Sequence, residues 1–239
     1  MLGRFLEISV QTPDILASLS FYESLGFQQV PTGEVWPYPY SVITDGRLFL
    51  GLHQHQIKSP TLSFVQADLA RHVAQLHQLG IVPDHEHLGG DSFNELSFHG
   101  PELQHIRLLE ARTFSPPDID VSFTSSCGYF VEYGMPVHEF DTALAFWEQL
   151  GFIAMSEEKK PFHRWSLTSD HLNLGLHRSR ALRKPLLVFE DPDMRERLSH
   201  LKERGFELSD EMPDSLDEHS NALLIAPEGT RLLLMQADV

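Results

Sequence analysis

The chain has 239 residues, of which 41% are hydrophobic, and its formal net charge at pH 7 is −16. This length allows one large domain or two of ordinary size with a packed core, while the charge disfavours nucleic acid and anionic membrane surfaces as partners. The single cysteine, Cys127, cannot form an intrachain disulfide, and no apolar run is long enough to span a bilayer, so we predict a cytoplasmic protein.

The first predicted unit of secondary structure ends at His53. It opens with a strand, because Leu, Ile and Val alternate with Phe, Glu and Ser along the sequence FLEISV. A helix follows, with Thr12 as its predicted N-cap, Pro13 as its first residue and Gly26 as its stop. Strand patterns complete the unit, and the last of them is RLFLGLH.

The same order of elements restarts at the strand sequence TLSFV. An amphipathic helix over residues 68–79 ends at Gly80, and the strand patterns NELSFHG and QHIRLLEA follow. The second half repeats the plan, with Asp191 and Pro192 opening its last helix and Gly205 closing it. We therefore predict four units of strand, helix and three strands, which form an α+β fold with mainly antiparallel or mixed sheets.

The two halves of the chain are copies of one another. FYESLGF at 21–27 returns as FWEQLGF at 146–152, and LGLH at 50–53 returns at 174–177. Internal duplication of this kind predicts tandem domains. The sequence RTFSPPDIDVSFTS is rich in turn-forming residues and has no counterpart in either half. The predicted first domain, linker and second domain are 1–112, 113–125 and 126–239.

Three segments carry a family resemblance: TPDILASLSFYESLGF after the opening strand, LSFVQADLARHVAQLHQLGI, and the closing hairpin FHGPELQHIRLLEA. They resemble the vicinal oxygen chelate superfamily, which includes glyoxalase I, extradiol dioxygenases and bleomycin resistance proteins. The resemblance covers nearly the whole chain. It implies two tandem glyoxalase-like domains, each of two βαβββ modules that form a cupped sheet. It does not specify a chemistry, because one fold hosts many functions.

Metal-binding members of the superfamily take ligands from the first strand of each module and from the last strand of the second module. The resemblance places Glu7, Thr61 and Arg107 at these positions in the first domain. Arginine does not ligate a metal, and the second-domain set contains leucines that cannot. We therefore expect no metal at the family's site and no cofactor. The second-domain positions are Glu132, Leu186 and Leu233.

Strand alternation predicts which side chains face the cup of each sheet. The set in the first domain is polar, whereas the second domain keeps only a glutamate and a histidine in an otherwise more apolar cup. We predict that these polar residues bind the ligand: Glu7, Ser9, His53, Thr61, Ser63, His105, Arg107, Glu132 and His177.

The first functional hypothesis is a metal-free cup that binds a small organic molecule. Glu7 and Arg107 would form an ion pair in place of the metal, and Arg107 would hold an anionic group of the ligand. His53 is the candidate general acid or base. The alternative interpretation of the pair is structural, and the sequence does not separate catalysis from binding alone. The expected assembly is a monomer or a homodimer.

The second functional hypothesis is a metal-dependent lyase or dioxygenase with a relocated site. Glu7, His53 and His105 supply two histidines and one carboxylate, a set that suits Fe, Zn, Mn or Ni. Two further segments are noted. DHEH at 84–87 has the residues of a metal cluster, but it is interpreted as a solvated loop or edge strand, with adventitious metal capture as the alternative. VWPYPY at 35–40 is interpreted as a rim over the cup or as a hydrophobic loop against the neighbouring domain.

Overall fold

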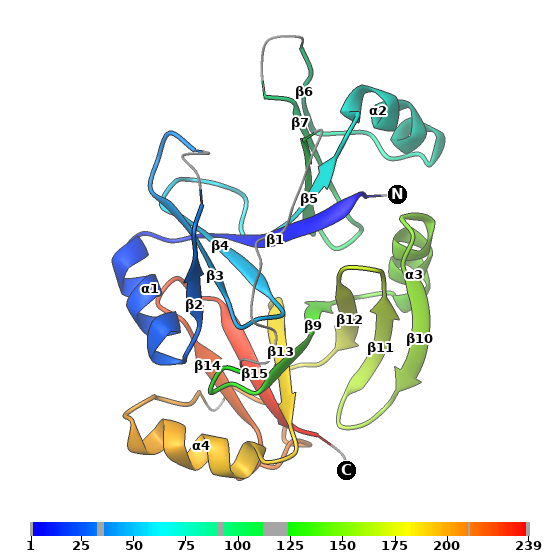
Figure 1. Cartoon of the computed structure of the whole chain (residues 1–239). Coiled ribbons are helices and arrows are strands. Elements are labelled where there is room, and N and C mark those ends of the chain that lie inside the picture. The colour runs from blue at the N-terminus through cyan, green and yellow to red at the C-terminus, as the bar shows by residue number, and fades with distance from the viewer. Residues whose placement is uncertain (1, 33–35, 90–92, 112–123, 210, 238–239) are drawn as a thin grey trace.

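The computed structural model describes residues 2–32, 36–89, 93–111, 124–209 and 211–237 (Figure 1). Within these ranges the chain forms two mixed sheets, one of eight strands and one of seven, together with four helices. Nearly all of the predicted linker, 113–125, lies outside the described residues. None of the described helices is long and apolar enough to cross a membrane.

The first sheet takes all its strands from the first half, in the order β2-β3-β4-β1-β5-β8-β7-β6. β1 lies parallel to β4 and antiparallel to β5, so the two βαβββ modules meet at the centre of the sheet (Figure 1). The strands are β1 (Arg4–Gln11), β2 (Gln28–Val30), β3 (Tyr40–Thr44), β4 (Phe49–His53), β5 (Thr61–Gln66), β6 (His85–His87), β7 (Glu95–His99) and β8 (His105–Glu110).

The second sheet repeats this arrangement in the order β10-β11-β12-β9-β13-β15-β14. Its last module is reduced: where a third strand is predicted, Ser209 makes an isolated bridge with Leu223. The segment that follows Ser209 is rich in acidic residues and contains Pro213, which disfavours a regular strand. The strands are β9 (Tyr129–Pro136), β10 (Ile153–Glu158), β11 (His163–Thr168), β12 (Asn173–Arg178), β13 (Leu186–Asp191), β14 (Ala222–Ile225) and β15 (Arg231–Gln236).

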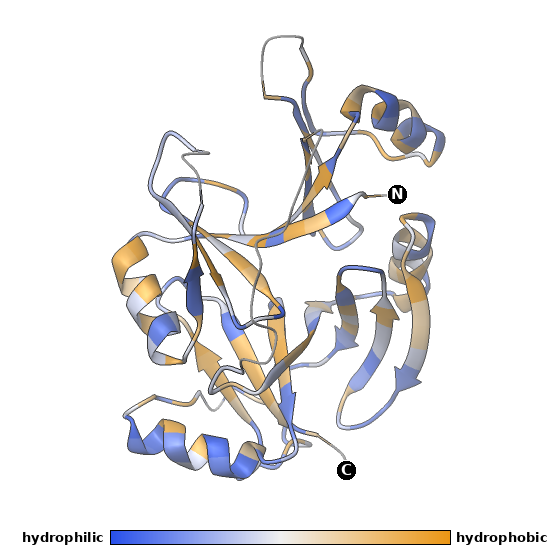
Figure 2. Ribbon diagram, viewed as in Figure 1, coloured by the Kyte–Doolittle hydropathy of each residue, from blue (hydrophilic) through white to orange (hydrophobic). Residues whose placement is uncertain are grey.

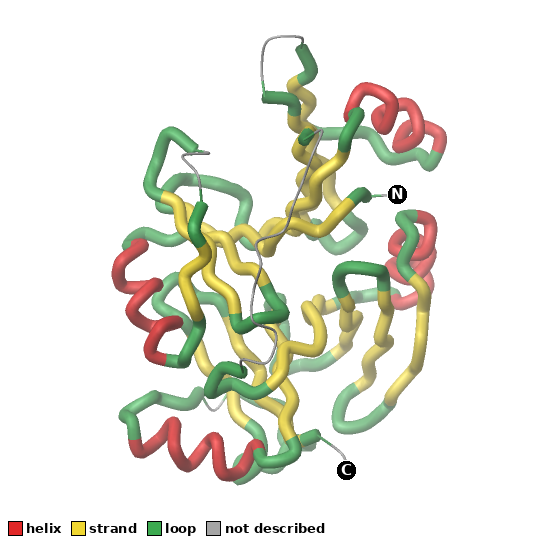
Figure 3. Tube along the Cα trace, viewed as in Figure 1, coloured by secondary structure: helices red, strands yellow, loops and turns green. Residues whose placement is uncertain are grey.

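The helices lie at the periphery of the strands (Figure 3). The first helix is capped by Asp14, whose carboxylate accepts hydrogen bonds from two backbone N–H groups of the first turn. The prediction that Thr12 is the N-cap is therefore wrong. The glycine stops at Gly26, Gly80 and Gly205 are confirmed, because each has a positive φ just after its helix. The helices are α1 (Ile15–Ser24), α2 (Leu69–Gln78), α3 (Phe140–Gln149) and α4 (Met194–Glu203).

The two halves share one hydrophobic core. The ring of Phe27, after α1, lies 6.2 Å from the ring of Phe189 on β13. Tyr22 on α1 donates a hydrogen bond to Glu228, with 2.7 Å between the oxygens. Hydrophobic residues follow the strands of both sheets, whereas α4 is largely hydrophilic (Figure 2). The division into domains at 1–112 and 126–239 stays a prediction.

Candidate functional site

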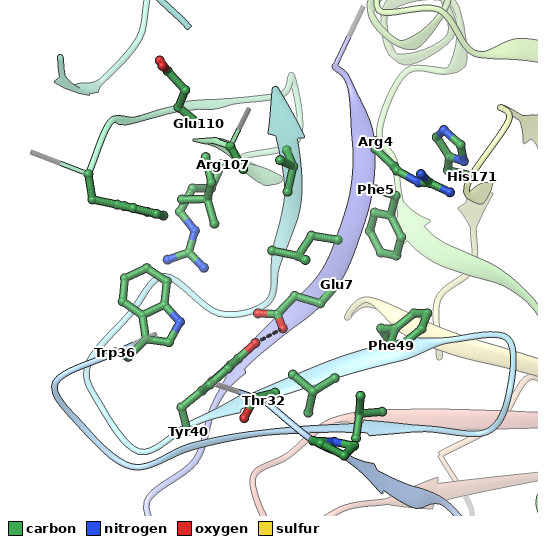
Figure 4. Close-up of a pocket in the computed structure, with 18 of the residues that line it drawn as sticks. Arg4, Phe5, Glu7, Thr32, Trp36, Tyr40, Phe49, Arg107, Glu110 and His171 are labelled. Atoms are coloured by element: carbon green, nitrogen blue, oxygen red, sulfur yellow. Dashed lines mark hydrogen bonds between the residues drawn. The ribbon is translucent and has the colours of Figure 1, made fainter. Parts of the chain in front are cut away.

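A cavity of about 480 Å³ lies over the face of the first sheet that carries Glu7 and Arg107. Both side chains point into it, from β1 and β8 (Figure 4). This volume is in the range of small-molecule pockets, which are mostly apolar with a few convergent polar groups. Aromatic side chains form much of the wall: Phe5, Trp36, Tyr40, Phe49 and Phe93.

The carboxylate of Glu7 is buried and has three hydrogen-bonding partners. Tyr40 donates to one oxygen at 2.5 Å, and Ser9 donates to the other at 2.6 Å. His53 Nε2 lies 3.0 Å from the oxygen that Ser9 also contacts. Burial raises the pKa of Glu7, but the hydrogen bond and charge of His53, with the two hydroxyls, bring it below its ordinary value. Glu7 is therefore a carboxylate at neutral pH.

The room for Glu7 comes from Gly51 on the neighbouring strand β4. A Cβ atom at Gly51 would lie 2.2 Å from the Glu7 carboxylate. The second half repeats this, because a Cβ atom at Gly175 would lie 2.1 Å from the carboxylate of Glu132. The duplicated LGLH sequence thus has a physical reason: its glycine lets a strand side chain cross the adjacent backbone.

Arg107 is one of three arginines that line the cavity, with Arg4 and Arg47. Its Nη2 donates to Ser9 and Ser63 at 3.2 and 3.3 Å, and its guanidinium carbon lies 5.1 Å from the ring centre of Trp36. Its Nε is buried, and no described residue forms a hydrogen bond with it. The predicted ion pair with Glu7 is wrong, because Ser9 stands between the two groups: it accepts from Arg107 and donates to Glu7.

The strand register changes one predicted family position in each half. Ser63, not Thr61, pairs with Glu7, and the same Ser63 pairs with Arg107 on β8. The row across the sheet is therefore glutamate, serine and arginine. Its counterpart in the second half is glutamate, valine and leucine. Neither row offers a set of three metal-ligating side chains. The second row is Glu132, Val188 and Leu233.

The structure separates His105 from Glu7 and His53. The hydroxyl of Thr61 lies 2.7 Å from His105 Nδ1, and the ring of His99 lies 5.0 Å from the ring of His105. Burial, followed by the charge of His99, lowers the pKa of His105 to about 4. The predicted metal set of Glu7, His53 and His105 is therefore not assembled in this structure.

A different set is assembled instead. Among the described residues, Asp84, His99 and His105 are the one group of three potential metal ligands whose ligand atoms all lie within 4.8 Å of one another. Sequence reasoning placed Asp84 in the solvated DHEH segment and did not consider His99. The remaining histidines of that segment, His85 and His87, are exposed on β6.

The second-half cup is filled with its own side chains. Glu132 makes a 3.4 Å ion pair with Arg164, and burial raises its pKa despite that charge. His177 hydrogen-bonds the carbonyl of Leu182, and burial lowers its pKa to about 4. Val188 and Leu233, which share a row with Glu132, belong to an apolar cluster, whereas the cavity described above lies over the first sheet, so we place the candidate site in the first half. The cluster is Phe162, Leu182, Leu186, Val188, Leu216, Leu223, Leu233 and Met235.

The described part of the VWPYPY segment lies at the cavity rather than against the neighbouring half. Trp36 and Tyr40 line the cavity, and the Trp36 and Tyr38 rings stack with 5.7 Å between centroids. The Tyr38 hydroxyl lies 3.2 Å from His53 Nδ1. The interpretation of this segment as a rim over the cup agrees with these contacts.

The structure resembles several solved dioxygenases. Catechol 2,3-dioxygenase matches with a TM-score of 0.61 and 14% identity, over 97% of this chain and 86% of that chain. 2,2',3-Trihydroxybiphenyl 1,2-dioxygenase from Sphingomonas wittichii matches with a TM-score of 0.64 and 15% identity, over 98% and 90%. Homoprotocatechuate 2,3-dioxygenase from Arthrobacter globiformis matches with a TM-score of 0.60 and 11% identity, over 97% and 78%. No family model matches the chain, and no curated protein matches it.

At this level of identity the likeness shows the fold alone. It confirms the predicted α+β fold of two tandem glyoxalase-like domains. The chemistry of the first-half cavity has to be argued from its own residues.

Proposed function

We propose that the first-half cavity binds a small organic molecule with a planar apolar body and an anionic group. The carrying observation is Arg107, whose buried Nε has no hydrogen-bond partner among the described residues. A buried donor without an acceptor costs about 1–3 kcal/mol. A ligand carboxylate or phenolate at this position would accept from the guanidinium and remove that cost. None of the described carboxylates forms an ion pair with Arg107.

The cavity walls support the planar body of the ligand. The ring of Phe93 lies 6.0 Å from Trp36 in an edge-to-face arrangement, and both line the cavity. Trp36 also covers the Arg107 guanidinium, which keeps the charged group in a fixed orientation. Phe5 and Phe49 line the cavity on the side of β1 and β4. Aromatic rings around a guanidinium held in a fixed orientation suit an aromatic acid or a phenol.

His53 is the predicted general acid or base, and the geometry favours an indirect role. It is fully buried, and it lies behind Glu7 rather than on the cavity wall. We infer that His53 and Tyr40 hold the Glu7 carboxylate in place, and that Glu7 itself contacts the ligand. Catalytic groups need to reach the reacting atoms, and Glu7 satisfies this requirement better than His53.

Two kinds of chemistry fit this pocket. The first is the metal-dependent dioxygenase or lyase, of which the comparisons favour the dioxygenase, because the solved structures that share the fold are dioxygenases. The row of Glu7, Ser63 and Arg107 favours ligand binding without a metal at the family's position. Metal content by plasma mass spectrometry, together with oxygen uptake in the presence of catechols, separates them. A bound metal together with oxygen uptake selects the first, and the absence of oxygen uptake, whatever the metal content, selects the second.

Ligand binding is tested by calorimetric titration with benzoate, naphthoate and catechol. Arg107→Leu should weaken binding at least tenfold, since a hydrogen bond to a charged group contributes about 1.5–3 kcal/mol. Arg107→Lys should restore part of the affinity but not the forked geometry. Arg195→Leu on the exposed surface of α4 is the matched control and should bind like wild type. Equal affinities of wild type and Arg107→Leu would refute the proposed role of Arg107.

A further inference from the structure

We propose that Asp84, His99 and His105 bind one divalent transition-metal ion, such as Zn²⁺ or Fe²⁺, on the second module of the first sheet. This site is distinct from the family's metal position on Glu7, Ser63 and Arg107, and it does not rest on ligand binding in the cavity. Two imidazoles and one carboxylate form a donor set that suits these ions.

The three donors are close enough for a single ion. Their ligand atoms all lie within 4.8 Å of one another, and Asp84 Oδ2 lies 2.7 Å from His99 Nδ1. Bonds to Zn²⁺ from nitrogen and oxygen are about 2.0–2.2 Å, so co-ligands of one ion stand roughly 3–4 Å apart. Small side-chain rotations would therefore bring the three donors onto one ion, which would replace the Asp84–His99 contact.

Two hydroxyl groups orient the donors. Thr61 donates its hydroxyl proton to the Lys58 carbonyl at 2.6 Å, so its oxygen accepts from His105 Nδ1–H at 2.7 Å. This hydrogen bond selects the tautomer in which Nε2 of His105 keeps a free lone pair. Ser97 donates to Asp84 Oδ1 at 3.0 Å, which leaves Oδ2 for the ion. Metal-ligating side chains in proteins are commonly held in place by hydrogen bonds to neighbouring groups such as these.

Backbone pairing between neighbouring segments brings the three donor residues together. His99 and His105 are cross-strand partners in the β7–β8 hairpin, and the Asp84 amide donates to the Ser97 carbonyl at 2.9 Å. The side chains of Asp84 and His99 are 40% and 27% exposed, which leaves a coordination position open to water or a small ligand. Arg107 is two residues from His105 on the same strand face, roughly 7 Å along β8. The ion would therefore share a sheet face with the candidate pocket.

The test uses tag-free, chelator-treated protein titrated with Co²⁺ and Zn²⁺ by calorimetry and visible absorption. We expect about one ion per chain, with Co²⁺ d–d bands that report nitrogen and oxygen ligands. His99→Ala and Asp84→Asn should each weaken binding at least 100-fold, since a three-donor set loses a direct ligand. Thr61→Val should weaken it about 10- to 100-fold, the range measured for second partners. The melting temperature of each metal-free variant checks that the fold is kept.

Two controls make the outcome decisive. His87→Ala removes an exposed histidine of β6 outside the proposed site, and it should leave affinity and stoichiometry unchanged. Glu7→Gln tests the set of Glu7, His53 and His105 expected from the sequence, and this variant should bind the metal with the affinity of wild type. Failure of wild type to bind, normal affinity in Asp84→Asn, or loss of binding in His87→Ala would each overturn the proposal. Arg107→Leu should keep metal binding, so failure of the cavity proposal is distinguishable from failure of this one.

Discussion

Gly51→Ala should drive the Glu7 carboxylate out of its position in the first-half cavity. The added methyl would lie 2.2 Å from a carboxylate oxygen, far inside the contact distance, and Glu7 is buried with hydrogen bonds to Tyr40, Ser9 and His53. Overpacking costs about 1–3 kcal/mol. Losing one hydrogen bond to a charged group costs about 1.5–3 kcal/mol more. Alanine offsets about 0.5–1 kcal/mol of this through its lower backbone entropy when unfolded.

The expected net loss is thus about 2–5 kcal/mol in the free energy of unfolding, measured by urea titration with tryptophan fluorescence. Glu7→Ala removes the clashing group, so Gly51→Ala should cost much less in that background than in wild type. This non-additivity is the signature of direct contact. Gly175→Ala with Glu132→Ala is the matched pair in the second half. A loss below about 1 kcal/mol that adds independently to Glu7→Ala would refute the reasoning.

Three further predictions concern buried titratable groups. The pKa of Glu7 is lowered, so its stabilising contribution is present at neutral pH and is lost as pH falls below about 4.5. The urea midpoint of unfolding should therefore depend less on pH in Glu7→Gln than in wild type between pH 3 and 6. Burial lowers the pKa of His177 to about 4, so stability should fall with acid between pH 6.5 and 4. His177→Gln should reduce that slope and leave the share of His105, whose pKa is also lowered to about 4. Burial raises the pKa of the Cys127 thiol to about 12, so a thiol reagent should react with it only at the rate of unfolding. An unchanged slope in either variant, or rapid labelling of the native chain, would contradict the corresponding assignment.

The two cups are lined by different side chains, yet local packing holds a glutamate carboxylate at the same place in each. Glu7 and Glu132 occupy equivalent strands and both need a neighbouring glycine. Their pKa values move in opposite directions, because His53 and two hydroxyls hold Glu7 while burial dominates at Glu132. Duplication of a sequence motif therefore preserved the geometry of the carboxylate but not its electrostatic environment.

The sequence alone was sufficient to predict the tandem α+β fold and the sheet face on which the polar residues of the first cup lie. Internal duplication revealed the two halves, and period-two alternation assigned Glu7, Ser9, Ser63 and Arg107 to one sheet face. Gly26 and its counterparts marked helix ends because a positive φ is costly for other residues. These signals are local, and each depends on only a few neighbouring residues.

Strand register and hairpin contacts were decided only by the tertiary structure. Alternation predicts which face of the sheet a residue lies on, but not which residue lies opposite it on the next strand. The sequence therefore placed Thr61 at the position beside Glu7, whereas Ser63 lies there in the structure. Asp84 meets His99 only because the residue before β6 pairs with β7. Nothing in the sequence of these two segments predicts that they pair in this register. The candidate metal site therefore depends on how β6, β7 and β8 pair.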